Sequence, residues 1–155
     1  MDRELVPYFA FGFFSGMRPL SELEPFTFEQ INYSENVLNV ISTKTASNPR
    51  RQVPISDNLK AWLAPFEEKS GLVCPSNLRR RITKARKESG ITWGHDIMRH
   101  SYGSYWEAAH RKESGCREQL SYNMGHSTFK TYEQNYRNDR SEADATAYWS
   151  ILPTR

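Results

Sequence analysis

The stretch Trp93-Gly-His-Asp-Ile-Met-Arg-His-Ser-Tyr-Gly-Ser-Tyr-Trp106 predicts a helix that presents a histidine and an arginine together. His95 and Arg99 are four residues apart, so one helical turn places both on the same face. An apolar stripe at helical spacing contains His95 and has Arg99 on its rim. The stripe consists of Met98, Tyr102, Tyr105, Trp106 and Ala109. An arginine at the edge of a core, with its donors still reachable, suits a phosphate or a carboxylate. This stretch alone leaves open a surface helix whose His and Arg have no special role.

The composition indicates one domain without disulfides. A chain of 155 residues can bury a core unaided, and an aromatic content of 13% supplies the side chains for it. Cys74 and Cys116 are too few for a disulfide scaffold, so we expect reduced thiols and a cytoplasmic protein. The apolar residues 5–14 are far too few to span a membrane. The Cys and His spacings do not match a zinc site, and we expect no metal and no cofactor.

The N-terminal part predicts a buried helix followed by a sharp junction. Residues 4–14 are apolar nearly all round, which is typical of a central helix, and Pro7 is tolerable only in its first turn. Pro19 disfavours a helical conformation for Arg18, so we expect Arg18 at the junction before a new short helix. Glu22, four residues later, could brace its guanidinium, although an ordinary surface ion pair would have the same spacing.

Strand patterns follow at residues 30–33, 37–43 and 51–55, with turns between them. The fold class is therefore α+β and mainly α-helical, with a small three-stranded antiparallel sheet at one edge. Lys44 lies where the middle strand enters its hairpin turn. A lysine there is usually only solvated, but it can also swing into a groove.

Residues 77–89 predict a strongly basic helix. The net charge of +3 is mild, but positive side chains crowd into this segment. A solvated helix face and a helix that follows phosphates are both compatible with this pattern. The phosphate-contact candidates in this helix and the hairpin are Arg50, Arg51, Arg79, Arg80, Arg81 and Lys84.

The C-terminal part predicts three short helices at residues 117–124, 129–137 and 142–152. The first leads into Gly125 and His126, where a glycine allows the backbone to turn sharply. The second carries Tyr132 and Tyr136 on one face. The last has an apolar side that could pack on its own chain or dock on a neighbouring protomer.

Five motifs in this order resemble the catalytic domain of the tyrosine recombinases, the phage-integrase family. They are Gly16-Met-Arg18-Pro-Leu-Ser-Glu22, Thr43-Lys44-Thr45, His95-Asp-Ile-Met-Arg99-His-Ser, Met124-Gly-His126-Ser and a tyrosine near the end. Each motif is weak alone, but five in the correct order, with matching element types between them, form a specific pattern. The resemblance runs from about residue 5 to residue 137.

The resemblance implies metal-independent DNA strand cleavage and rejoining through a covalent 3′-phosphotyrosyl intermediate. Arg18 and Arg99 would neutralise the charge on the reacting phosphate, as fixed guanidinium groups can. The resemblance makes Glu22 the brace for Arg18, Lys44 the general acid, and His95 and His126 the groups that donate hydrogen bonds and assist proton transfer.

The nucleophile implied by the resemblance is Tyr136. It lies ten residues after His126, a spacing that matches the family, whereas Tyr132 lies only six residues after and is expected to be a packing residue. We expect double-stranded DNA as the partner, a homo-oligomer on the DNA and no membrane. Residues 1–155 would form a single catalytic domain in which the family's N-terminal DNA-clamping domain is absent. Residues 141–152 would be a tail helix that protomers could exchange.

Two rival functions come from other classes. A catalytically silent DNA-binding module could keep the same fold, although the complete residue set argues against it. A metal-dependent nuclease would need clustered acidic ligands that this sequence lacks.

Overall fold

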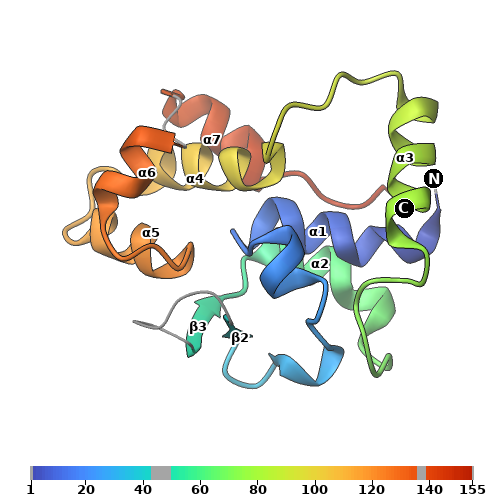
Figure 1. The fold of residues 1–155 in the computed structure, drawn as a ribbon. Coiled ribbons are helices and arrows are strands. Elements are labelled where there is room, and N and C mark those ends of the chain that lie inside the picture. Colours follow the sequence, from blue (N-terminus) through green and yellow to red (C-terminus); the bar gives the residue numbers. More distant parts are fainter. Residues whose placement is uncertain (1, 43–49, 136–138, 155) are drawn as a thin grey trace.

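The computed structural model describes residues 2–42, 50–135 and 139–154. Across these ranges the chain is mainly helical with one three-stranded antiparallel sheet, so the predicted fold class is confirmed (Figure 1). The α-helices are α1 (Val6–Phe14), α2 (Asp57–Leu63), α3 (Leu78–Ser89), α4 (Ile97–His110), α5 (Cys116–Asn123), α6 (Phe129–Asn135) and α7 (Glu142–Trp149). The strands are β1 (Ile31–Asn32), β2 (Val37–Ile41) and β3 (Arg50–Pro54). Single helical turns are η1 (Arg3–Leu5), η2 (Pro19–Leu23), η3 (Phe28–Gln30) and η4 (Ala64–Phe66).

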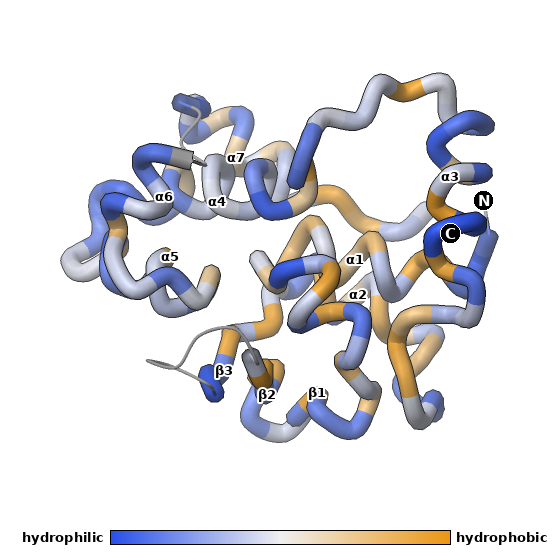
Figure 2. The backbone as a smooth tube through the Cα atoms, in the orientation of Figure 1, coloured by the Kyte–Doolittle hydropathy of each residue, from blue (hydrophilic) through white to orange (hydrophobic). Residues whose placement is uncertain are grey.

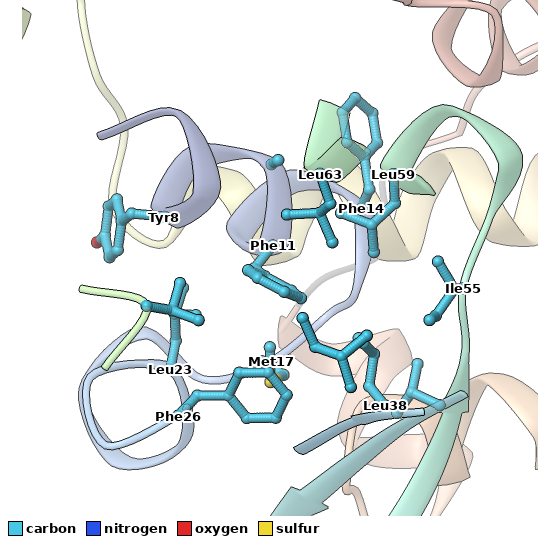
Figure 3. Close-up of a cluster of buried hydrophobic side chains, with 14 of the residues drawn as sticks. Tyr8, Phe11, Phe14, Met17, Leu23, Phe26, Leu38, Ile55, Leu59 and Leu63 are labelled. Atoms are coloured by element: carbon cyan, nitrogen blue, oxygen red, sulfur yellow. The ribbon is translucent and has the colours of Figure 1, made fainter. Parts of the chain in front are cut away.

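Helix α1 is the centre of the core, as its apolar sequence predicts. It packs against α2 and α4, and Pro7 lies in its first turn. Phe11 is fully buried and its ring contacts Phe26 edge-on, with the ring centroids 5.2 Å apart. Figure 3 shows the buried hydrophobic cluster, in which Leu23 of η2 and Leu38 of the sheet lie below α1, and Leu59 and Leu63 of α2 lie beside Phe14. Figure 2 shows hydrophobic segments gathered around α1 and hydrophilic residues along much of α3.

The sheet buries one of its faces. Strand β2 pairs antiparallel with β1 and β3, and Val40 lies opposite Arg51. Side chains alternate between the two faces of a strand, so Arg51 points the same way as the buried Val53, and Gln52 points to solvent. The alternation therefore places an arginine on the core side of β3.

Helix α4 begins at Ile97, later than predicted. Asp96 has a left-handed backbone conformation with φ of 49°, which interrupts the helix and leaves His95 in a turn before it. Trp93 is held away from the helical path because its ring packs on Phe9 and under the guanidinium of Arg86. Residues 90–96 consequently form the extended link between α3 and α4 in Figure 1.

Helix α7 packs on α4 and α1 of its own chain. The Tyr148 hydroxyl donates to the Phe13 carbonyl at 2.5 Å, and its ring stacks on Tyr105 with centroids 4.2 Å apart. The Trp149 indole N–H donates to the Tyr105 carbonyl. Exchange of this helix between protomers stays a prediction, because it is a property of an assembly of several chains.

Within the described ranges, no helix combines the length and the apolar character needed to cross a bilayer.

Candidate functional site

The site is built around the tight turn at residues 124–126, which follows α5. The His126 amide donates to the Ser121 carbonyl and the Gly125 amide to the Tyr122 carbonyl, the bond pair that ends a helix with a left-handed residue. Gly125 is that residue, with φ of 65°. A Cβ atom on Gly125 would lie 2.9 Å from an Nη atom of both Arg18 and Arg51. The 124–126 turn therefore needs glycine for its conformation and for the close approach of two guanidinium groups.

Arg18 reaches this turn from the junction before η2. Pro19 keeps Arg18 extended, with φ of −71° and ψ of 125°. Its Nη2 donates to the Gly125 carbonyl at 2.7 Å, and its Nη1 donates to Glu22 Oε1 at 2.7 Å. The predicted contact between Arg18 and Glu22 is thus present. The Arg18 side chain remains 25% exposed, so its guanidinium is still accessible to a ligand.

Glu22 is buried between two arginines. Arg51 forms a bidentate ion pair with its carboxylate, with N–O distances of 2.9 and 2.7 Å. Arg18 contributes its Nη1 and its backbone amide, the latter 2.8 Å from Oε2. Burial alone would raise the pKa of the Glu22 carboxyl, but the hydrogen bonds and charges of Arg51 and Arg18 outweigh burial and hold this pKa at about 2. Glu22 is therefore ionised at any physiological pH.

The free energy of unfolding should fall in acid because Glu22 loses its charge. A carboxyl whose folded pKa is below its unfolded value stabilises the fold above the unfolded pKa, and this contribution disappears as the pH falls through the folded pKa. For Glu22 the interval runs from about 4.5 down to about 2. We expect a loss of about 3 kcal/mol from this group, measured by urea unfolding at a series of pH values.

The matched control is Glu22→Gln, which cannot titrate at this position. Its free energy of unfolding should be lower than wild type at pH 7 and should approach the wild-type value at the acid end. His126, which is present in both proteins, adds a loss in the same direction that begins at its ordinary pKa of 6.5. Parallel pH curves for the two proteins would contradict the prediction.

Arg99 converges on the same turn from α4, but it is more deeply buried than predicted. Its Nη1 donates to the Gly16 carbonyl, and its Nη2 lies 3.1 Å from the Met124 carbonyl and 2.9 Å from His126 Nε2. The residue is 1% exposed. The prediction of an arginine on the rim with a reachable fork was therefore wrong for this conformation. The cause is the pair of backbone carbonyls, from the loop after α1 and the end of α5, which draw the guanidinium inward.

His126 is held as a neutral imidazole. A guanidinium can only donate, so His126 Nε2 accepts from Arg99 and the ring proton is on Nδ1. Burial and then the charges of Arg99, Arg18 and Arg51 lower the pKa of His126 to about 3. The expectation of a side chain that titrates near neutrality was wrong for His126, since the ring is buried and three arginines surround it.

His95 is not beside Arg99 on a shared helical face. It is exposed in the turn before α4, and no other described residue hydrogen-bonds its side chain. The predicted pairing assumed an unbroken helix from Trp93, and the left-handed conformation of Asp96 removes that geometry. Asp96 itself lies 3.7 Å from Arg99 Nε.

The phosphate-contact candidates divide into exposed and engaged side chains. Arg50, Arg79, Arg80 and Lys84 are exposed. Lys84 lies 3.7 Å from Glu88, an exposed pair that contributes little. Arg81 instead forms ion pairs with Asp2 and Glu4, both at 2.7 Å, which join α3 to the N-terminal turn η1. The assignment of Arg51 as a phosphate contact is corrected, because its side chain is fully buried and bonded to Glu22.

The remaining predicted residues include two outside the described part of the chain. Lys44 and Tyr136 lie there, so their roles stay predictions. Tyr132 is 0% exposed and packs against Phe129 and Gly103, as expected for a packing residue.

The residue whose place the sequence analysis missed is Arg51. Its signal was present, because Arg51, Val53 and Ile55 alternate with polar or exposed positions along β3. A buried arginine needs partners that match its charge and its donors, and for Arg51 the Glu22 carboxylate supplies the opposite charge.

Taken together, the described site contains three guanidinium groups, one ion-paired carboxylate and a neutral imidazole around one turn. Asp96 lies at the edge of the site, and the three arginines still outnumber the two carboxylates, so the site has an excess of positive charge. Such a cluster, with one arginine partly exposed, is suited to bind an anion with several oxygen atoms. Among the described residues, no three His, Cys, Asp or Glu side chains are grouped as a metal site would require.

Comparison with solved structures gives the class of fold. The chain has a tyrosine recombinase-like fold, mainly helical with the small antiparallel sheet. The structure of XerA recombinase superposes with a TM-score of 0.68 over 99% of this chain, at 18% sequence identity. This chain spans 60% of the length of that recombinase. Neither the sequence profile of a known family nor the sequence of a curated protein matches this chain.

Proposed function

We propose that this protein is a tyrosine-type site-specific DNA recombinase that cuts and rejoins double-stranded DNA without a metal. The observation that carries the proposal is the convergence of Arg18 and Arg99 on the 124–126 turn. These arginines come from segments far apart in sequence, and they meet in a fold that is similar to a recombinase. Integration of a mobile element and a cytoplasmic location are the setting that we propose for this reaction.

Arg18 and Arg99 would stabilise the charge that develops on the phosphate. During the reaction, phosphorus becomes pentacoordinate and its non-bridging oxygens carry negative charge, which preorganised donors can neutralise. Arg18 is accessible and can donate directly to the phosphate. Arg99 is buried, so it would stabilise the phosphate through its charge alone unless it exchanges one carbonyl partner for the phosphate. Neutral His126 would donate through Nδ1–H once a rearrangement exposes this buried atom, and His95 would assist removal of the phenolic proton.

Tyr136 would be the nucleophile and Lys44 the general acid. The Tyr136 oxygen forms a bond to phosphorus while the bond from phosphorus to the 5′-oxygen breaks. Lys44 gives its proton to that leaving oxygen, which becomes a free 5′-hydroxyl. The 3′-phosphotyrosyl link keeps the bond energy, so a 5′-hydroxyl from another strand can reverse the step without ATP. Glu22 would brace Arg18 throughout.

DNA binding would use the exposed basic side chains Arg50, Arg79, Arg80 and Lys84. Contacts to phosphates position a protein on DNA but do not read its sequence, and they weaken steeply with salt. Recombination joins two DNA strands, so a homo-oligomer on DNA is part of the proposal.

A catalytically silent DNA-binding module is the second candidate, and one observation favours it. Arg99 is 1% exposed and is bonded to backbone carbonyls, so it does not present a free fork to a ligand.

The test uses nicked suicide duplexes with randomised sequence, incubated with the protein in EDTA. Covalent adducts are recovered under denaturing conditions and the attached strands are sequenced, so the target site is identified in the same step. The recombinase proposal expects an adduct linked to the 3′ end of the cut strand. DNA binding without any adduct would support the silent module, and cleavage that needs added magnesium would indicate a metal-dependent nuclease.

A further inference from the structure

Arg51 is a buried arginine of the site, and the proposed reaction gives it no catalytic role. It lies on the core side of β3, and both its side chain and that of Glu22 are 0% exposed. Charged side chains this deeply buried persist only when their hydrogen-bonding groups are matched. The three partners of Arg51 therefore indicate what the side chain holds in place.

The first two partners are the two oxygens of Glu22. Each oxygen accepts two hydrogen bonds, one from Arg51 and one from Arg18. A carboxylate has about four acceptor positions, so this arrangement fills them. Because Arg51 takes one position on each oxygen, the plane of the carboxylate is fixed, and the other two positions point toward Arg18.

The third partner is the end of α5. Arg51 Nε donates to the Asn123 carbonyl at 2.9 Å, and Arg51 Nη1 lies against Gly125. The next residue, His126, contacts Arg99. Arg51 thus connects β3, η2 and the 124–126 turn through one planar group.

We propose that Arg51 is a positioning residue, which fixes Glu22 and the 124–126 turn so that Arg18 and His126 are aligned to bind the reacting phosphate. This inference rests on the proposed recombinase function. Lysine cannot replace Arg51, because one ammonium cannot match both carboxylate oxygens and the Asn123 carbonyl in a planar arrangement.

The variants are Arg51→Lys, which keeps the charge, and Arg51→Met, which keeps most of the length. Gln52→Met, on the solvent side of the same strand, is the matched control. We expect Arg51→Lys to lower the rate of adduct formation at saturating DNA by about 10- to 100-fold, because a misplacement of about 1 Å is enough for such a loss. DNA affinity and the rate of Gln52→Met should remain near wild type.

The pH profile separates positioning from simple loss of stability. The charged or titratable groups facing Glu22 are Arg18 from the junction before η2, Arg51 from β3 and His126, with Arg99 of α4 beyond it. In Arg51→Met, the buried Glu22 carboxyl loses its strongest partner and its pKa rises. Adduct formation by this variant should therefore decline from pH 7 to pH 5 more steeply than that of wild type.

A second readout does not depend on activity. The ¹³C resonance of the Glu22 carboxyl, followed by NMR against pH, should titrate higher in Arg51→Lys and Arg51→Met than in wild type, and the Arg18 guanidinium resonances should shift. If wild type forms no adduct, the proposed function fails. The resonances then still test whether Arg51 fixes the position of the Glu22 carboxylate and, through it, of Arg18. Three results would overturn the inference. Folded Arg51→Lys could form the adduct at the wild-type rate, or its rate could fall only in proportion to the folded fraction. The Glu22 and Arg18 resonances could also remain unchanged in the variants.

Discussion

Replacing Tyr136 by phenylalanine is expected to abolish the covalent protein–DNA adduct while leaving DNA binding intact. The phenolic oxygen is the atom that would form the bond to phosphorus, and phenylalanine differs from tyrosine only by its absence. Tyr136 is ten residues after His126, the spacing that resembles the family's nucleophile. The measurement is adduct formation on the suicide duplex under denaturing conditions, with DNA affinity measured in parallel.

Tyr132→Phe is the matched control, since it removes the same atom from the neighbouring tyrosine. Tyr132 is fully buried against Phe129, and its ring fills the space beside Gly103 of α4. We expect this variant to form the adduct at nearly the wild-type rate. If Tyr132→Phe abolished the adduct and Tyr136→Phe kept it, the nucleophile would have to be reassigned.

Replacing Arg18 by lysine is expected to lower the rate of adduct formation by about 100- to 1,000-fold at saturating DNA, the effect of removing one preorganised donor from a charged transition state. The Arg18 guanidinium bonds to Glu22 and Gly125 at once and still has an exposed part for a ligand. An ammonium cannot make all these contacts from one position. The effect should fall on the rate of the chemical step more than on DNA affinity.

Stability should change little in Arg18→Lys. Glu22 keeps its bidentate partner Arg51 and the backbone amide of residue 18, so the buried carboxylate is not left without donors. Arg111→Lys is the matched control, because Arg111 is an arginine that donates to a backbone carbonyl in an exposed position outside the site. A variant of Arg18 that binds DNA more weakly but reacts at the wild-type rate would contradict the assigned role.

Patterns within single segments predicted most of the elements. The all-round apolar character of residues 4–14 identified the buried α1, and the Pro19 constraint identified the junction at Arg18. The i, i+4 spacing of Arg18 and Glu22 was sufficient to predict their contact, because both groups lie in one short turn. The order of the motifs also led to the fold class that the structure confirms.

The errors in the candidate site arose where one segment meets another. The depth of Arg99 depends on carbonyls contributed by Gly16 and Met124, and the low pKa of His126 depends on its burial and on three arginines from other elements. His95 left the predicted face because Trp93 packs on Phe9 and Asp96 takes a left-handed conformation. None of these partners can be identified from the periodicity of a single helix.

Sequence alone determined which elements form and which of their faces are apolar, because periodicity and turn chemistry act over a few residues. Only the tertiary structure decided which charged groups meet. Arg18 bonds to Gly125 across 107 positions and Arg51 to Asn123 across 72, and the sequence contains other arginines with similar local surroundings. The physical reason is that a buried charge is held by the partners that surround it in space, and packing of distant segments selects those partners.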